Sequence, residues 1–313
     1  MIELQAVGKT YGSTQAVDGV SLRIERGEFV VLIGPSGSGK STLLKMINRL
    51  VEHDRGKILF KGEEIRSFKP EDIRRRMGYA IQSTGLFPHW SVARNIATVP
   101  ELLGWPAARI AARVDELLTL LGLEPQAYRG RFPHQLSGGQ QQRVGVARAL
   151  AADPEALLMD EPFGALDPIT RLTLQDELAR IHRASGKTIV LVTHDIDEAL
   201  RLATRIVLLD RGRVVQAGTP AQLLAQPASE LVSDFLGRND LGLKLLGLHR
   251  VAERMQLGVP AEVTAGAQIT ATLSLRDALS IFVERQVDRL PVADADGRVV
   301  GTLHFAALLV RRP

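Results

Sequence analysis

The chain has 313 residues, 45% hydrophobic and 24% charged, so it is long enough for one large and one smaller domain with buried cores. A net charge of +4 and 4% aromatic residues give no argument for a nucleic-acid partner, and the absence of cysteine excludes disulfides, zinc–thiolate sites and a cysteine nucleophile. The N-terminus lacks the pattern of a signal peptide, and no stretch is apolar over the length of a membrane helix. We therefore expect another chain to supply any membrane span.

The first half of the sequence contains apolar strands followed by a helical segment. Residues 1–33 are predicted to be short strands joined by turns, ending in the buried strand EFVVLIG. A helix is expected at 40–50, a hairpin at 56–65 and another buried strand at 77–82. From about 85 to 150 the pattern is helical. A helical insert between two α/β parts is therefore predicted.

Strands and helices alternate again from residue 156 to residue 218, which predicts a parallel sheet covered by helices. Two short helices at 219–236 are expected to close this domain. Residues 237–270 have weak periodicity and are predicted to be a linker or connector. A helix is predicted in TLSLRDALSIFVERQ, with Ser274 and Asp277 as a capping box. A strand, an Asp-Gly turn and a second strand are predicted after it.

The stretch GPSGSGKST has the composition and the position of a phosphate-binding loop, because it follows an apolar strand and opens a helix. Its glycines let backbone N–H groups surround phosphates. Lys40 is expected to reach the β- and γ-phosphates, and the Ser41 hydroxyl to bind Mg²⁺. The residues assigned to the nucleotide here are Gly34, Pro35, Ser36, Gly37, Ser38, Gly39, Lys40, Ser41 and Thr42.

Two acidic residues end the apolar run ALLMDEP. Asp160 is expected to hold the Mg²⁺ shell, and Glu161 to orient or deprotonate the water that attacks the γ-phosphate. On its own, such a pair is a solvated turn as often as it is a functional site. The phosphate loop earlier in the chain favours the functional interpretation. His194, at the end of the next strand, is a candidate to hydrogen-bond the γ-phosphate, although a lone histidine at a strand end is more often structural.

Three further features are ambiguous when each is taken alone. The turn in LSGGQQQRVGVARAL opens a helix and suits an anion, which makes Ser137, Gly138, Gly139 and Gln140 a second candidate phosphate site. Gln82 ends a predicted strand, where glutamines are also common on surfaces. Tyr11 is a candidate to stack on adenine, or it merely packs.

In this order, Tyr11, GPSGSGKS, Gln82, LSGGQ, LLMDEP, GALD and His194 resemble the motifs of ATP-binding cassette (ABC) ATPases over residues 1–236. The resemblance implies an α/β fold of the P-loop NTPase class, with a RecA-like core, an antiparallel β subdomain and a helical subdomain at about 85–150. It also implies head-to-tail homodimers that sandwich two MgATP, with Ser137–Gln140 facing the nucleotide of the partner chain. Asp167 would link the two sites, and Gln82 would bind Mg²⁺ and sense a membrane partner. The implied catalytic residues are Lys40, Glu161 and His194, and the implied metal ligands are Ser41, Gln82 and Asp160.

The stretch GLFPHWSVARNIATVPELLGW follows Gln82, where importer cassettes receive a helix of the membrane subunit. Phe87, Pro88, Trp90 and Val92 are predicted to be an exposed apolar cluster that suits a partner, the alternative being that they pack the helical subdomain. Together with MINRLVEHDRG and EPFGALDPITR, this stretch is similar to the cassettes of glycine betaine/choline (osmoprotectant) importers, especially their Yeh-type branch.

This resemblance implies a Mg²⁺-dependent ATPase, a translocase, that powers uptake of a quaternary-ammonium osmoprotectant. The implied partners are a second cassette, permease subunits docking near Gln82 and Phe87–Val92, and an extracytoplasmic solute-binding protein, without nucleic acid. The implied location is the cytoplasmic face of the plasma (inner) membrane. Two alternatives stay open: an importer cassette for an amino acid or a polyamine, and a soluble ABC ATPase that acts on nucleic acid or ribosomes.

Residues 265–313 resemble one CBS module (the cystathionine-β-synthase type), which is a small α+β fold, and 237–264 is predicted to be a linker or a decayed first copy. In nucleotide-binding CBS modules the last strand ends in Thr or Ser, with an Asp three residues later. The corresponding residues here are His304 and Ala307, so the acid is missing. We expect a structural or dimer-contact role, with ionic-strength sensing through Arg311 and Arg312 as an alternative.

Overall fold

A computed structural model describes residues 1–81, 85–164, 166–258, 268–294 and 296–309. The chain divides into two compact units, Met1–Ala217 and Gly218–Pro313. The two short helices at 219–236, which were expected to close the first domain, fall in the second unit. Within the described residues no helix is long and apolar enough to span a bilayer.

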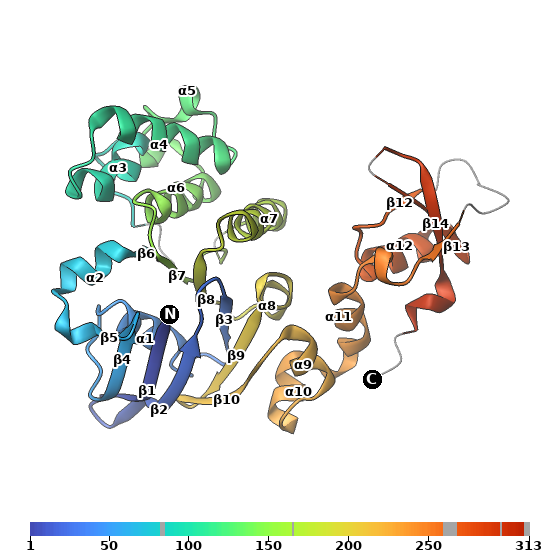
Figure 1. Ribbon diagram of the computed structural model, residues 1–313, viewed down its shortest axis with the longest axis horizontal. Coiled ribbons are helices and arrows are strands. Elements are labelled where there is room, and N and C mark those ends of the chain that lie inside the picture. The colour runs from blue at the N-terminus through green and yellow to red at the C-terminus, as the bar shows by residue number, and fades with distance from the viewer. Residues whose placement is uncertain (82–84, 165, 259–267, 295, 310–313) are drawn as a thin grey trace. The chain divides into compact units, whose positions relative to one another are not determined.

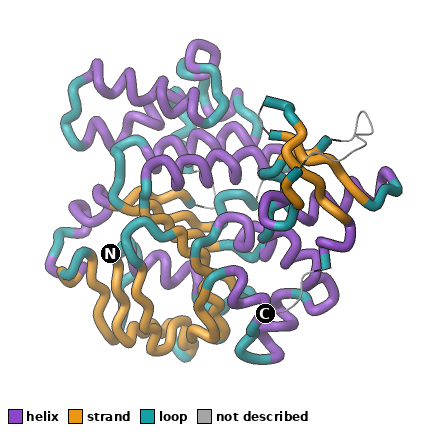
Figure 2. The backbone as a smooth tube through the Cα atoms, turned by 45° about the vertical axis from the view of Figure 1, so that its right-hand side comes forward, coloured by secondary structure: helices purple, strands orange, loops and turns teal. Residues whose placement is uncertain are grey.

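The first unit contains a six-stranded sheet in the order β10-β9-β3-β8-β7-β6 (Figure 1), and Figure 2 draws the strands in orange. The strands from β9 to β6 run parallel. Every residue of β3, β7 and β8 is buried, because helices cover a parallel sheet on both faces. The parallel sheet predicted from the sequence is confirmed. The strands are β3 (Phe29–Ile33), β6 (Met77–Ala80), β7 (Ala156–Asp160), β8 (Thr188–Val192), β9 (Arg205–Asp210) and β10 (Arg213–Gly218).

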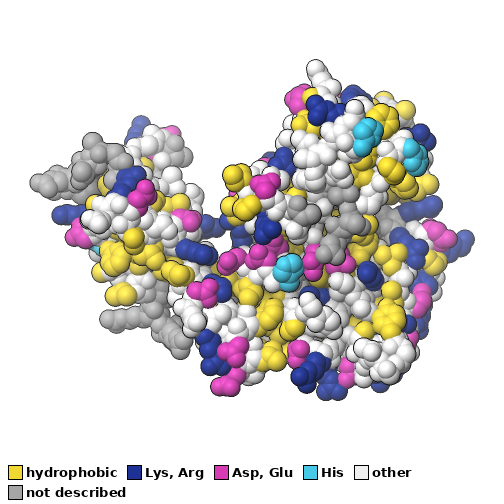
Figure 3. Space-filling model, turned by 180° about the vertical axis from the view of Figure 1, so that it is seen from behind, with side chains coloured by type: hydrophobic (Ala, Val, Ile, Leu, Met, Phe, Trp, Pro, Cys, Tyr) yellow, Lys and Arg dark blue, Asp and Glu magenta, His cyan; other side chains and the backbone are white. Residues whose placement is uncertain are grey.

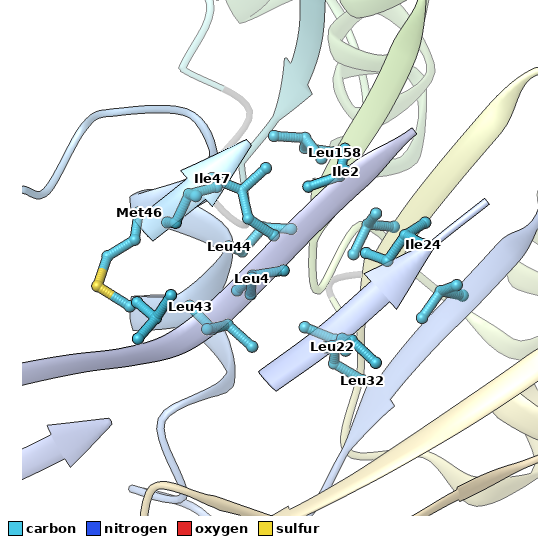
Figure 4. Close-up of a cluster of buried hydrophobic side chains, with 14 of the residues drawn as sticks. Ile2, Leu4, Leu22, Ile24, Leu32, Leu43, Leu44, Met46, Ile47 and Leu158 are labelled. Carbon is cyan, nitrogen blue, oxygen red and sulfur yellow. The ribbon is translucent and has the colours of Figure 1, made fainter. Parts of the chain in front are cut away.

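A second, antiparallel sheet has the order β2-β1-β4-β5, with β1 (Ile2–Tyr11), β2 (Thr14–Ile24), β4 (Arg55–Phe60) and β5 (Glu63–Glu64). Its first two strands have 10 and 11 residues and are longer than predicted, because bulges let them bend without ending. One bulge includes Ala6, whose φ is 48°. Buried side chains of β1, β2 and β3 pack with those of helix α1 (Lys40–Ile47) in one core (Figure 4).

The remaining helices of the first unit cover the sheet or form the helical subdomain. Helix α1 contacts β2, β7 and β8, and it ends before the predicted Leu50 because Arg49 has a φ of 50°. Ser91 caps α3 and Ser137 caps α6, so each of these helices begins with a serine that accepts from a backbone N–H group. The helices of the first unit after α1 are α2 (Pro70–Arg76), α3 (Val92–Leu102), α4 (Ala107–Leu120), α5 (Pro125–Tyr128), α6 (Gly138–Leu150), α7 (Pro168–Ser185) and α8 (Ile196–Leu202).

The second unit is a small α+β fold. Its sheet has the order β11-β14-β13-β12, in which only β12 and β13 pair in parallel among the described residues. Ser274 caps α12, and its Oγ donates to the Asp277 carboxylate (2.7 Å), so the predicted capping pair is in contact. The elements are α9 (Pro220–Ala225), α10 (Glu230–Leu236), α11 (Leu241–Leu248), β11 (Gln256–Leu257), β12 (Ile269–Thr270), α12 (Leu275–Arg285), β13 (Arg289–Ala293) and β14 (Val299–His304).

The prediction that 237–270 is a linker or connector is wrong for the described residues of this segment. Residues 241–248 form helix α11, which packs on α12, and Leu246 and Val251 lie in the core of the second unit. The sequence LGLKLLGL is apolar on several sides, so it lacks the clean polar face by which a helix is recognised. The buried Lys244 ammonium donates to the Leu236 carbonyl (2.6 Å) and to Asp240 (3.0 Å), which fixes α11 against α10.

Replacing Leu246 tests whether α11 is part of this core. We expect Leu246→Ala to lower the free energy of unfolding by about 2–5 kcal/mol, because it leaves a cavity beside buried side chains. Leu243, on the same helix, is 42% exposed, and Leu243→Ala is expected to change stability by less than about 1 kcal/mol. Urea unfolding of the full chain measures both values. Equal effects of the two substitutions would refute the assignment of α11 to the core.

Candidate active site

The loop between β3 and α1 lies at the edge where the parallel strands end. Gly34 and Gly39 have φ values of 144° and 98°, and a Cβ on either would overlap a backbone carbonyl, of Leu209 and of Ala16 respectively. Only glycine fits both positions. Ser38 is buried, whereas Pro35, Ser36 and Gly37 are exposed at the tip of the loop.

The Lys40 side chain is buried beneath this loop. Its ammonium donates to the carbonyls of Gly34 and Pro35, both at 2.8 Å, and to Ser38 Oγ at 3.2 Å. Burial lowers the pKa of Lys40, while the carboxylates of Glu161 and Asp160 act in the opposite direction. The ammonium therefore sits at the base of a loop whose N–H groups suit phosphate oxygens.

The oxygen atoms expected to bind Mg²⁺ lie together at this edge. Ser41 Oγ donates to Asp160 Oδ1 at 2.8 Å, and Asp160 is 7% exposed at the end of β7. Mg²⁺ prefers oxygen ligands and takes few of them from protein, since waters and substrate phosphates complete its shell. This hydroxyl and carboxylate fit that ion. The third expected ligand, Gln82, lies outside the described residues.

Glu161 and His194 are brought together by two neighbouring strands. Glu161 follows β7, His194 follows β8, and Glu161 Oε2 lies 3.3 Å from His194 Nδ1. Glu161 has a φ of 47°, unusual for a residue with a side chain, and its N–H donates to the Val192 carbonyl at 2.9 Å. The carboxylate is 22% exposed and the imidazole 66% exposed. The arrangement places a base and a histidine beside the phosphate loop.

The second candidate phosphate site, the turn at residues 137–140, is held in place by its own side chains. Ser137 Oγ accepts from Gln140 N (3.3 Å), and Gln140 Oε1 accepts from Ser137 N (3.0 Å), which forms a capping box at the start of α6. A Cβ on Gly138 would meet nothing, whereas one on Gly139 would lie 3.1 Å from Thr170. The turn therefore presents an open glycine backbone at a helix N-terminus.

Two further residues assigned from the sequence lie at element ends. Tyr11 is 49% exposed, with the Lys9 ammonium 5.3 Å from its ring centre, so its ring is not used for core packing. Asp167 caps α7, where its carboxylate accepts from Thr170 N at 3.0 Å. Hydrogen bonds from Thr170 hold the pKa of Asp167 below its usual value, so this exposed group stays ionised.

The predicted apolar cluster is exposed only in part. Phe87 is 38% exposed, and its ring lies 4.3 Å from that of Trp90, but Val92 is fully buried and packs the helical subdomain. The expectation that Val92 is exposed is therefore wrong, because it is the first residue of α3 and faces the interior. Asn95 fixes the loop: its amide accepts from Phe87 N (2.8 Å) and donates to the carbonyls of Phe87, Trp90 and Ser91.

A groove of about 270 Å³ lies beside this cluster, between strand β6 and helices α3 and α6. Phe87, Tyr79 and Val99 contribute apolar surface, and Arg74, Arg75 and Arg148 contribute guanidinium groups. Burial raises the pKa of the Tyr79 hydroxyl, and the nearby Asp160 carboxylate adds to this effect. The groove therefore combines apolar and aromatic surface with guanidinium groups.

Sequence reasoning missed several residues that hold the site. Tyr128 accepts a hydrogen bond from Gln140 Nε2 at 3.0 Å, Asn95 ties the Phe87 loop, and Arg171 and Glu198 flank the loop of His194. Each belongs to a helix whose polar residues could equally be solvated, so nothing in the sequence marks Tyr128, Asn95 or Arg171. Glu198, three residues after the cap Asp195, carries the weak signal of a helix start.

Comparison with known proteins decides the family. The family model "ABC transporter" matches residues 17–164, and the model "CBS domain" matches residues 267–311. The glycine betaine uptake system ATP-binding protein YehX of Escherichia coli (strain K12) is 61% identical over 310 residues, which cover 99% of both chains. The chain belongs to the ABC transporter family. It is an ATP-binding, ATP-hydrolysing subunit of that family.

Two further comparisons support this ABC assignment. The glycine betaine/carnitine/choline transport ATP-binding protein OpuCA of Bacillus subtilis (strain 168) is 48% identical over 96% of this chain and 77% of its own length. A solved structure titled as the dimeric post-hydrolysis state of the ATP-binding cassette MJ0796, bound to ADP and Pi, has a TM-score of 0.65 and 35% identity. The matched region covers 70% of this chain and 99% of the solved chain. The P-loop NTPase fold and the C-terminal CBS domain predicted from the sequence are confirmed.

Proposed function

We propose that this ABC subunit powers the uptake of a quaternary-ammonium osmoprotectant, such as glycine betaine or choline, through separate membrane subunits. The observation that carries the proposal is the 61% identity to a glycine betaine uptake subunit, which extends through the C-terminal unit to 99% of both chains. On the face seen in Figure 3, basic and acidic side chains are interspersed, and no broad basic band for nucleic acid is present there.

The proposed ATP site assigns a task to each residue near the phosphate loop. The loop N–H groups and Lys40 hold the β- and γ-phosphates, and Tyr11 offers its exposed ring to adenine. Ser41, Asp160 and Gln82 would hold Mg²⁺, which neutralises phosphate charge when it is bound. Glu161 takes the proton of the attacking water, and His194, 3.3 Å from Glu161, hydrogen-bonds the γ-phosphate.

The turn at residues 137–140 leads us to propose that the chain works as a dimer. Ser137, Gly138, Gly139 and Gln140 would complete the ATP site of a second copy of this chain, and Asp167 would connect the two sites. The solved MJ0796 cassette is described as a dimer, which supports a dimer of this chain as well. Closure of the dimer around two ATP molecules would then move the attached membrane subunits, and hydrolysis would reopen it.

The permease is proposed to dock beside Gln82, on the exposed part of the Phe87 loop and in the adjoining groove. The aromatic pair Phe87 and Trp90 and the arginines of the groove suit an amphipathic segment with acidic residues. The chain would then be peripheral, at the cytoplasmic face of the inner membrane, with a solute-binding protein on the other side. For the C-terminal unit, in which Ala307 packs against the core, we propose a structural or dimer-contact role.

Uptake by the complete transporter tests this function. The chain is co-expressed with the membrane subunits and the solute-binding protein of its transport system, in cells that lack other osmoprotectant uptake, and radiolabelled glycine betaine and choline are supplied. We expect ATP-dependent uptake of at least one of them, abolished by Glu161→Gln in this chain. Uptake of an amino acid or a polyamine alone, or ATPase activity stimulated by RNA or DNA without any uptake, would reject the proposal.

A further inference from the structure

A polar network with two buried members, Thr193 and Glu198, joins the loop of His194 to the turn of Asp167. Thr193, which is 2% exposed, follows β8 and donates from Oγ1 to Glu198 Oε2 at 2.6 Å. The same Thr193 oxygen accepts from Asp195 N at 3.0 Å, so the backbone on both sides of His194 is fixed by one hydroxyl. Glu198 is 5% exposed, and its own N–H donates to Asp195 Oδ1 at 3.1 Å.

Arg171 connects this loop to the turn before α7. Its Nη2 donates to the Leu166 carbonyl at 3.2 Å, directly before Asp167. Its Nη1 lies 3.7 Å from Asp195 Oδ2 and its Nε lies 3.9 Å from Glu198 Oε1. One guanidinium therefore hydrogen-bonds the carbonyl of one loop and forms longer ion pairs with two carboxylates of the other.

We propose that Arg171 and Glu198 are positioning residues that make the His194 loop and the Asp167 turn move as one body. The inference rests on the proposed roles of His194 and Asp167 in ATP hydrolysis. His194 would act on the ATP held by its own chain, whereas Asp167 would face the second copy. A rigid connection between them lets the state of one ATP site set the geometry of the other.

The burial of Glu198 accounts for the rigidity of this connection. A carboxylate taken out of water needs compensating partners, and here they are the Thr193 hydroxyl, at 2.6 Å, and the Arg171 guanidinium, at 3.9 Å. If the Asp167 turn shifted alone, Arg171 would have to release either the Leu166 carbonyl or the two acids. Movement of both loops together preserves all of these contacts.

Steady-state ATP hydrolysis by the full chain tests the proposal. Arg171→Met keeps the apolar stem but removes the guanidinium, and we expect kcat to fall roughly 10–100-fold, because small misplacements of reacting groups cost about this much. The KM for MgATP is expected to stay within about two-fold, since neither residue belongs to the proposed nucleotide site. Arg171→Lys is expected to lie between the parent and Arg171→Met, because one ammonium cannot reach all three oxygens.

The matched control is Arg180→Met on the same helix. Arg180 pairs with Glu177 at 2.6 Å on the exposed side of α7, so its loss is expected to leave kcat unchanged. Glu198→Gln is also measured alone. The double variant Arg171→Met/Glu198→Gln is expected to lose no more activity than about the larger of the two single losses, because both single changes break the same connection. Thermal unfolding of each variant shows whether it is folded under the assay conditions.

A parental kcat for Arg171→Lys, or losses that multiply in the double variant, would overturn the inference. This holds even if Arg171→Met does not fold, since the lysine variant keeps the charge and the stem. A parent chain without Mg²⁺-dependent ATP hydrolysis would instead count against the proposed site. A parent that hydrolyses ATP but drives no osmoprotectant uptake would count only against the transport proposal.

Discussion

Glu161→Gln is expected to reduce ATP hydrolysis about 10²–10⁴-fold while ATP binding persists, because the amide keeps the shape of the side chain but cannot accept the proton of water. Glu161 Oε2 also lies 3.3 Å from His194 Nδ1, so the variant keeps a hydrogen-bonding group beside the histidine. With hydrolysis blocked, the closed form accumulates. We therefore expect Glu161→Gln to elute as an ATP-dependent dimer in gel filtration.

Glu155→Gln is the control for this experiment. Glu155 stands directly before β7 and pairs with Lys61 at 2.6 Å on the surface, so it lies at the opposite end of the same strand. Its replacement is expected to leave the rate of ATP hydrolysis within about two-fold of the parent. Hydrolysis by Glu161→Gln at the parental rate would show that another group takes the proton.

Gly34→Ala is expected to destabilise the chain by at least about 3 kcal/mol and to abolish MgATP binding. The alanine Cβ would overlap the Leu209 carbonyl of the neighbouring strand and would lie 2.9 Å from Ser38 Oγ. The loop would have to move, and its N–H groups would no longer converge on one point. Urea unfolding and calorimetric titration with MgATP measure the two effects.

Gly37→Ala separates this packing effect from backbone strain alone. Gly37 has a φ of 78°, but a Cβ there would meet no atom within 4 Å. We expect a loss of roughly 1–2 kcal/mol, which is the cost of the left-handed conformation, and retained binding. Equal losses for the two glycine variants would mean that the overlap with Leu209 does not determine the shape of the loop.

The sheet and the phosphate loop could be predicted because local sequence and global fold agree there. Buried strands such as FVVLI and TIVLV are continuous apolar runs, and a lysine placed after glycines and before a helix, as Lys40 is, specifically indicates a phosphate loop. The pairing of Ser41 with Asp160 then follows from strand order, since strands that run parallel end at one edge.

The helix α11 and the positioning residues could not be predicted in the same way. Leu246 and Val251 are buried by contacts with α12 and its sheet, which lie later in the chain. Arg171 and Glu198 are separated by a helix and a strand, and only the folded chain brings them together. The burial of Val92 could not be predicted for a related reason, because an apolar residue at a helix start can face inward or outward.

The contacts of Lys40 bear on how nucleotide enters the site. The phosphate loop is already wound around its own lysine, whose ammonium is hydrogen-bonded to backbone carbonyl oxygens of that loop. An incoming phosphate exchanges these contacts for its own, so little conformational entropy is lost on binding. The loop is thus preorganised, and we expect the rate of nucleotide association to be set by diffusion into the site and not by loop ordering.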